Sequence, residues 1–468
     1  MPPSAVQEHV ADRTARKNAL GLQAPSPRAF EPLARRGGVP HAPAPPGMAR
    51  PRRESAGPAA EAAPGQVTLL RTETAEFYYR ATEAGATVVF CECDATCLRF
   101  PDTLGGVIVT RIAENAAADL TSVESAILPR RLREIGEQAF ARCLNLKDIE
   151  PGCALESIGS GAFRGCRRLA AIDFPDTLRH IGTGAFSNTS LQRVRIPASC
   201  AGIEPDALCT GPSFPGSAGL AYASSLQEIV VEGGNPSFSL RGGVLARTLE
   251  HGSLEAVLCP GRAQDVDLSR GFSRVSPTAF AGTTAIGHLR LPEQIELPQN
   301  ACALPHLSCD HLTICFATPR GGATQLGLEL PQGAARTRIL SQAFEGQDRI
   351  RPEAIAAAYD GEIAQLDDDY DRTRLMAARL ARPVLLADEH RAHFTGEAAR
   401  SMLNLCVHAG GRNDWRTLDD ALASGALARE GVSEIVSALN RFGFALAAAH
   451  VLKAARERFG EAHADYDL

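Results

Sequence analysis

Apolar residues recur at a fixed spacing through the middle of the chain. A segment of the form Ile-Gly-x-x-Ala-Phe occurs three times, and its phenylalanines Phe140, Phe163 and Phe186 are 23 residues apart. After each of these segments, apolar and polar residues alternate over a few positions, as in Val194-Arg-Ile196. Alternation of this kind is typical of a strand that buries one face. The pattern therefore predicts a series of similar coils, each containing a short strand and a turn.

One such coil cannot bury its apolar face alone, so neighbouring coils must stack into a solenoid. We expect the phenylalanines to point into the interior, and Pro151, Pro175 and Pro197 to end the strands, because proline cannot donate to a strand ladder. A period of 20–29 residues with this apolar pattern is typical of a leucine-rich-repeat solenoid. We predict this solenoid over residues 67–345. Inserts at 198–225 and 293–335 are expected to form loops from one face or irregular coils, and a last degenerate copy is expected at 339–344.

The two flanking sections have different patterns. Residues 1–66 are rich in Pro, Ala and Arg, which predicts a disordered tail. A docking arm for an acidic partner is the alternative for this tail. Residues 351–468 carry apolar side chains at steps of three or four, which predicts an all-α C-terminal domain. Pro352 suits a first helical turn, and Thr395 and Asp414 are expected to cap helices.

Composition narrows the class of protein. The chain has 468 residues, of which 44% are hydrophobic and 22% charged, and its formal net charge of −6 disfavours a general nucleic-acid binder. The sequence has no apolar run long enough to span a membrane and no recognisable export signal. Its 13 cysteines include no Cys-x-x-Cys pair. We therefore expect a protein without a transmembrane segment, in the reducing cytoplasm.

Motifs for catalysis or cofactor binding are missing from the sequence. It contains no P-loop, no His-Glu-x-x-His and no Gly-x-Ser-x-Gly. Cys91, Cys93 and Cys97 form the only tight cysteine cluster; ordinary strand cysteines are expected there, with a metal or redox site as the alternative. Cys143 and Cys166 occupy equivalent repeat positions and are expected to be buried. We therefore predict no enzymatic activity, no catalytic residue, no cofactor and no metal.

The outward positions of the predicted strands are the best candidates for binding, because stacked coils present an extended concave sheet. Acidic and basic bands follow one another along this face, which favours a mixed-charge protein partner over nucleic acid. The alternative is an ordinary solvated sheet face. The candidate partner-binding residues are Asp148, Glu150, Asp173, Arg193, Arg195, Glu228, His288 and Arg290.

The repeats resemble the bacterial leucine-rich repeats of the BspA type. The resemblance rests on the Ile-Gly-x-x-Ala-Phe-x-x-Cys segments around Phe140 and Phe163 and on Asn235-Pro-Ser-Phe238, which is similar to an insert of that family. It implies a non-enzymatic scaffold for protein–protein interaction. The alternative that it implies is a cell-surface adhesin or antigen, exported by a signal that the sequence does not show. The helical section is weakly similar to ankyrin-like tails.

Overall fold

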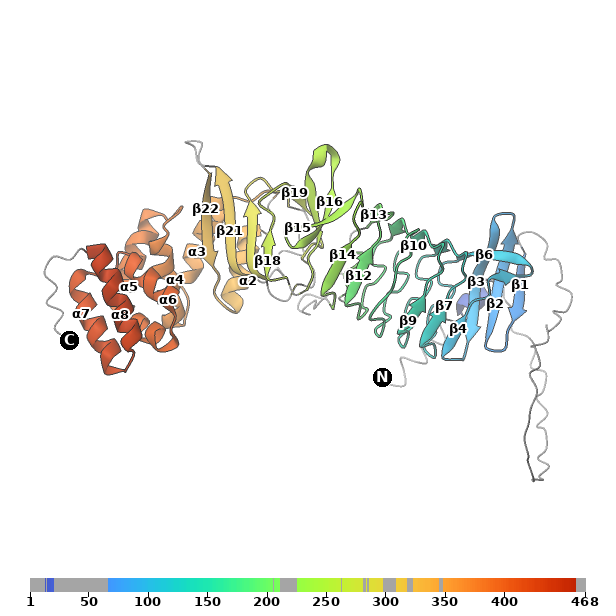
Figure 1. The fold of residues 1–468 in the computed structure, drawn as a ribbon, viewed down its shortest axis with the longest axis horizontal. Coiled ribbons are helices and arrows are strands. Elements are labelled where there is room, and N and C mark those ends of the chain that lie inside the picture. The colour runs from blue at the N-terminus through green and yellow to red at the C-terminus, as the bar shows by residue number, and fades with distance from the viewer. Residues whose placement is uncertain are drawn as a thin grey trace, which may run out of the picture.

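The computed structural model describes residues 13, 15–20, 66–204, 206–210, 225–261, 263–280, 283, 286–297, 309–317, 323–344 and 348–459. Figure 1 shows an elongated molecule in which a long array of strands, coloured blue to yellow, is followed by orange and red helices. This confirms the predicted solenoid with a helical region after it. Apart from residues 13, 15–20 and 66, the predicted disordered tail lies outside the described residues.

Antiparallel strands close the N-terminal end of the array. β1 (Val67–Arg71), β2 (Ala75–Thr82) and β3 (Gly85–Cys93) pair in sequence order. β3 then pairs in parallel with β6 (Val107–Ile112). β5 (Thr103–Leu104), which precedes β6 in the chain, pairs with β6 as a short antiparallel hairpin. β3 therefore connects the antiparallel end to the parallel coils.

Each coil contributes to two strips of parallel strands. The turn strip runs through the isoleucine of the Ile-Gly turns, a strand that the sequence pattern did not predict. The site strip holds the strands that the pattern did predict. The turn strip consists of β6, β8 (Glu134–Ile135), β10 (Ser157–Ile158), β11 (His180–Ile181) and β13 (Gly202–Ile203). The site strip has two separately paired parts. The first is a sheet of β4 (Cys97–Arg99), β7 (Ser125–Ile127) and β9 (Asp148–Glu150); the second is β12 (Arg193–Ile196), which pairs with β14 (Glu228–Val231) and is bridged to Ala171 of the coil between the two parts.

The repeated phenylalanines form a continuous stack inside the coils. The ring of Phe163 lies 5.4 Å from those of Phe140 and Phe186, nearly parallel to both, and all three side chains are buried. The turns themselves are joined by hydrogen bonds, such as the 2.8 Å bond from the Phe140 amide to the Ala162 carbonyl. Stacking of identical positions therefore holds each coil to the next.

Glycine at the turn is explained by the close approach of successive coils. A Cβ atom on Gly159 would lie 2.7 Å from backbone atoms of the preceding turn, which is closer than side chains tolerate. The predicted burial of Cys143 and Cys166 is also confirmed. Their thiols donate to carbonyl oxygens in the preceding coil, at 3.1 Å each, and burial raises the pKa of Cys166 well above its usual value. These cysteines therefore have a structural role.

A three-stranded meander interrupts the array after β14. It consists of β15 (Phe238–Arg241), β16 (Val244–Thr248) and β17 (Leu254–Leu258), with the 3-10 turn η1 (Glu250–Gly252) before β17. The Asn235 side chain fixes the start of the meander, because the side-chain amide nitrogen of Asn235 donates to the carbonyls of Pro197 and Cys200 in the preceding coil. β17 pairs in parallel with β19 (Phe272–Val275), so the chain returns to coil geometry.

The meander also divides the hydrophobic interior. Leu245 of β16 packs into the core of the N-terminal coils. Its neighbours Val244 and Ala246 pack into a second core that extends to the helices. A β-bulge after Leu245 leaves Val257 of β17 out of the ladder, and both Val257 and Leu258 face the first core. One strand therefore supplies side chains to both cores.

A four-stranded sheet follows the meander. It is formed by β18 (Asp265–Asp267), β20 (Ile286–Pro292), β21 (Cys309–Ala317) and β22 (Ala323–Glu329). The expectation of loops or irregular coils over 293–335 is therefore wrong for β21 and β22, which are regular strands that extend the sheet. The described part of the other predicted insert, 198–204, 206–210 and residue 225, includes β13, and residues 205 and 211–224 lie outside the described residues.

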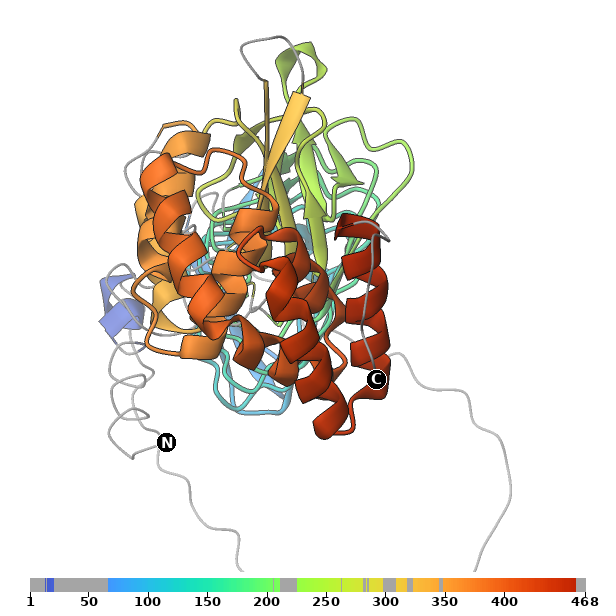
Figure 2. The same cartoon turned by 90° about the vertical axis from the view of Figure 1, so that its left-hand side faces the viewer.

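Seven helices complete the described chain and cover the end of the array (Figure 2). Their bounds are α2 (Ala334–Phe344), α3 (Pro352–Ile363), α4 (Asp369–Ala381), α5 (Asp388–Arg412), α6 (Trp415–Ala423), α7 (Arg429–Arg441) and α8 (Ala445–Phe459). The structure confirms Pro352 in the first turn of α3 and Asp414 as the cap of α6, where it accepts from the Thr417 amide. Thr395 lies inside α5 and bonds the Arg391 carbonyl, so its prediction as a cap was wrong.

The predicted last repeat copy at 339–344 was also wrong, because these residues belong to α2. Ala335, Ile339, Leu340 and Phe344 are all buried and recur at helical rather than coil spacing. They lie in the same hydrophobic core as β20, β21 and the later helices. The helices therefore share their core with the end of the array.

Candidate interaction surface

The structure places the predicted binding residues on the outer side of their strands. In β9, Ile149 is buried between the exposed residues Asp148 and Glu150. In β12, Val194 is buried, while Arg193 is exposed and Arg195 half-buried. Asp173 and Glu228 are exposed as well. Strand alternation therefore positioned these six side chains as the sequence predicts.

The eight predicted residues do not share one sheet. Six lie on the site strip, where the parallel register places Arg193 beside Glu228. His288 and Arg290 lie on β20, in the sheet beyond the meander. The expectation of one continuous face therefore requires a correction. The meander lies between the two groups in the chain. Among the described residues, β14 pairs only with β12, and β20 belongs to the four-stranded sheet that begins with β18.

The two site-strip arginines are already paired within the chain. Nε of Arg193 lies 3.2 Å from a Glu228 carboxylate oxygen in the next strand of the strip. Arg195 donates to the Phe174 carbonyl at 2.8 Å, pairs with Asp176 at 3.2 Å and also contacts Glu232. Exposed pairs such as Arg193–Glu228 contribute about 0–1 kcal/mol each. The basic band of the pattern therefore marks ion pairs between coils.

The β20 residues are paired in the same manner. Arg290 bonds Asp267 at 3.1 Å, and His288 lies 3.7 Å from Asp265; both acids come from β18, one coil earlier. Burial of Asp267 opposes its ionisation, but bonds from Ser269 and Arg290 outweigh this and lower the pKa of its carboxyl group. The His288 ring also meets that of His311, at 4.6 Å between ring centroids.

The three carboxylates before the arginine band differ from these paired residues. Asp148, Glu150 and Asp173 make no ion pair with any residue in the part of the chain that the structure describes. Asp148 and Glu150 lie on β9 and Asp173 lies on the next coil, and all three side chains are exposed. They form what we call the acidic surface of the site strip. Its charges are available for a partner with basic side chains.

Two members of the cysteine cluster have the properties of structural thiols, and the third, Cys97, is half-buried. Cys91 and Cys93 are buried, and burial raises the pKa of Cys91 to about 12. A thiol of this kind is protonated at neutral pH, whereas a nucleophile or metal ligand must be a thiolate. Among the described residues, no group of three or more His, Cys, Asp or Glu side chains is placed to hold a metal ion.

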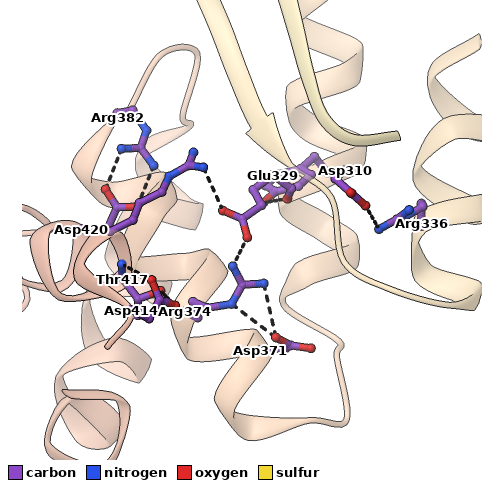
Figure 3. Close-up of polar contacts among 11 residues, drawn as sticks. Asp310, Glu329, Arg336, Asp371, Arg374, Arg382, Asp414, Thr417 and Asp420 are labelled. Atoms are coloured by element: carbon purple, nitrogen blue, oxygen red, sulfur yellow. Dashed lines mark hydrogen bonds and ion pairs between the residues drawn. The ribbon is translucent and has the colours of Figure 1, made fainter. Parts of the chain in front are cut away.

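A polar cluster that the sequence did not indicate joins the last strand to the helices (Figure 3). Glu329, at the end of β22, binds Arg374 of α4 and lies 3.9 Å from Arg416 of α6. Its backbone carbonyl accepts a 2.7 Å hydrogen bond from the Tyr359 hydroxyl of α3. One residue therefore contacts three helices, and no repeat or motif marks it in the sequence.

Two further ion pairs secure these helices. Arg382 forms a two-bond pair with Asp420 at 2.6 and 2.7 Å. Arg379 bonds Asp360 at 2.7 and 3.1 Å, with both side chains almost fully buried. Their geometry fixes the helices against one another. The polar residues here act in packing.

Comparison with known proteins is consistent with the repeat geometry. Residues 86–211 match the model of the BspA type leucine rich repeat region in six copies. No curated protein matches the chain. No helix within the described ranges is long and apolar enough to cross a membrane. The ankyrin-like resemblance of the helical section stays a prediction, since the matched residues lie in the array.

Several solved bacterial structures are similar over part of the chain. The leucine rich repeat protein of T. pallidum is 27% identical, over 33% of this chain and 80% of its own, with a TM-score of 0.30. The pneumococcal vaccine antigen PcpA is 19% identical, over 52% and 70%, with a TM-score of 0.37. A leucine-rich repeat protein of Bacteroides ovatus is 19% identical, over 51% and 61%, with a TM-score of 0.35. Residues 86–211 are therefore similar in sequence to leucine-rich repeats of the BspA type, and the strand register described above stacks them as parallel coils.

Proposed function

We propose that the protein is a non-enzymatic scaffold that binds a protein partner through the site strip of its repeat array. The observation that carries this proposal is the acidic surface formed by Asp148, Glu150 and Asp173, which are exposed on two successive coils and have no ion-pair partner among the described residues. The neighbouring arginines already have partners within the chain. The partner therefore presents basic side chains to the acidic surface and neutral or acidic groups beside the arginines.

The assignment of the eight candidate residues changes accordingly. Asp148, Glu150 and Asp173 contact the partner in this proposal, whereas Arg193, Arg195 and Glu228 hold the coils together beside them. His288 and Arg290 lie on a separate sheet and are left out of the binding surface. Reversal of the arginine charges would break bonds within the array, so these residues offer a poor test of binding.

A charge-reversal variant tests the acidic surface. Asp148→Lys, Glu150→Lys and Asp173→Lys are combined, and partner capture from extracts of the source cells is compared with wild type. We expect capture to fall at least about tenfold, because like charges now oppose the basic partner. Salt should weaken wild-type capture too, since exposed charges are screened.

A matched control changes the same number of carboxylates elsewhere. Glu73, Glu83 and Glu434 are exposed, and none makes an ion pair with a described residue. Their combined replacement by lysine should leave capture at the wild-type level. Equal capture by all three proteins would remove the acidic surface from the proposal.

The compartment is the second part of the proposal. We propose a cytoplasmic protein, supported by the cysteines within the described residues, all of which are free thiols. Leucine-rich-repeat proteins of the BspA type are typically surface or interaction proteins, which favours the adhesin or antigen as the second candidate function. Protease treatment of intact cells distinguishes them. Protection supports the scaffold inside the cell, and cleavage supports the surface adhesin.

A further inference from the structure

A short helical segment near the N-terminus lies against the first strands of the array. The segment comprises residues 13 and 15–20, and residues 21–65 separate it in sequence from the array. Figure 2 shows it in blue-violet at the side of the molecule. Arg13, Arg16 and Lys17 are spaced at i, i+3 and i+4, so they share one helical face.

Arg13 binds the array through its whole guanidinium group. Its two terminal nitrogens donate to the carbonyl oxygens of Ala118 and Cys91. The same group lies over the Phe90 ring, at 4.8 Å from the centroid. Two carbonyl acceptors and an aromatic face together form a site for a planar cation.

The other two cations each meet a carboxylate. Arg16 pairs with Asp119, whose fully buried side chain also bonds Arg142 at 2.7 and 2.8 Å. Lys17 pairs with Glu92 at 2.7 Å and lies 5.2 Å from the centre of the Tyr78 ring. Burial opposes the charge of Lys17, but Glu92 and Tyr78 outweigh it and raise the lysine pKa.

The aromatic part of this surface is separate from the two main cores. In β2, Phe77 and Tyr79 point into the array, while Tyr78 points to the other side. There Tyr78 forms a small cluster with Val89 and Phe90 of β3. All three are buried in the presence of the helical segment. We call Tyr78, Phe90, Glu92, Asp119 and the carbonyls of Cys91 and Ala118 the receptor surface.

We propose that the receptor surface is a binding site for a basic helical peptide of the form Arg-x-x-Arg-Lys, and that the helical segment of residues 13 and 15–20 of the same chain occupies it. Each of the three cations meets its own part of this surface: Arg13 the two carbonyls and one ring, Arg16 one carboxylate, and Lys17 the other carboxylate and the other ring. The N-terminal tail is thus a self-docking arm. The receptor surface is distinct from the acidic surface, so this inference does not depend on the proposed function.

The first experiment measures binding of a fluorescent synthetic peptide of residues 8–20 to the full-length protein. A released variant carries Arg13→Ala, Arg16→Ala and Lys17→Ala. A tethered segment can reach an effective concentration of about 1 mM, so the arm of the wild type should exclude the free peptide. We expect the released variant to bind the peptide at least about tenfold more tightly than wild type.

A control variant removes three cations from the same tail at Arg50, Arg52 and Arg53, and it should exclude the peptide as wild type does. Failure of the released variant to bind the peptide, or binding as weak as that of wild type, would overturn the proposal. Sedimentation tests whether the receptor surface is occupied by the helical segment of a second copy of the chain. A wild-type dimer that the released variant loses would show docking onto a second copy and would overturn docking within one chain.

A charge exchange checks the site itself with side chains that are partly exposed. Glu92→Lys should weaken binding of the peptide to the released variant, and a peptide carrying Lys17→Glu should restore it. The Glu92 side chain is 38% exposed, so its replacement leaves the buried interior unchanged. Equal binding of both peptides to both proteins would contradict the assigned pairing.

Discussion

The N-terminal coils and the C-terminal part of the molecule are held together in different ways. Each coil of the array contacts its neighbours through the same few positions, exemplified by the stacked rings of Phe140, Phe163 and Phe186. Beyond the meander, one core joins a four-stranded sheet to helices, and single contacts such as Glu329–Arg374 determine their placement. Stability is therefore a sum of similar interfaces in the N-terminal coils, whereas it depends on individual residues at the helical end.

The largest effect should come from breaking the aromatic stack. Phe163→Ala removes a fully buried ring and should lower the free energy of unfolding by about 3–5 kcal/mol. Because the core of the N-terminal coils is separate from the core that contains α6, the urea transition of these coils by circular dichroism should move, while that of Trp415 fluorescence in α6 should stay.

Leu446→Ala is the control, because this side chain is 75% exposed, and it should change either transition by less than about 0.5 kcal/mol. If Phe163→Ala shifts both transitions equally, the array and the helices unfold as one unit, and the comparison fails.

A smaller loss of stability is expected at Glu329, where the last strand of the array contacts the helices. Glu329→Gln keeps the shape of the side chain but removes the charge that Arg374 and Arg416 contact. Because Arg374 is largely buried, the variant should lose about 1–3 kcal/mol in the Trp415 transition. Glu397→Gln, which affects a pair with the exposed Arg400, should lose less than about 1 kcal/mol. Equal losses in the two variants would argue against a special role for Glu329.

The smallest expected effect is the loss of stability at acidic pH that arises from His311. Burial lowers the pKa of His311 below its ordinary value of 6.5, against the opposing effect of the nearby Glu329 carboxylate. Below pH 6.5 the unfolded chain therefore binds this proton more readily than the folded chain, so stability should fall slightly as pH drops through 6.5 towards the folded pKa. Urea midpoints at pH 7.5, 6.5 and 5.5 measure this. His311→Gln should flatten the dependence, and identical slopes would contradict the assignment.

Much of the array could be predicted from the sequence because every coil uses the same positions. The buried phenylalanines, the ends of the strands and the outward side chains all follow from a 23-residue step. The turn strip was missed, since two-residue strands such as Glu134–Ile135 are too short to show alternation. α2 was mistaken for a coil because Ile339 and Phe344 have the spacing of the repeat, although the glycine of the clear copies is missing.

The candidate surface was predictable in position but not in chemistry. Alternation places Asp173 and Arg193 on the outside, but it cannot tell which charges are neutralised by a neighbouring coil. That depends on register, which sets Arg193 opposite Glu228 across a long insert. Glu329 and Arg374 are likewise distant in sequence and belong to different elements, so no local pattern connects them.

Because Val244, Leu245 and Ala246 point alternately to opposite sides, β16 forms the boundary between two hydrophobic cores and contributes side chains to both. Because side chains change sides at every residue, removal of one residue before Leu245 would exchange the contents of both cores at once. Neither side could then adjust without the other. A strand with such a double role tolerates substitution by a side chain of similar size, but not a change in length. Insertions and deletions should therefore be tolerated outside β16 rather than within it.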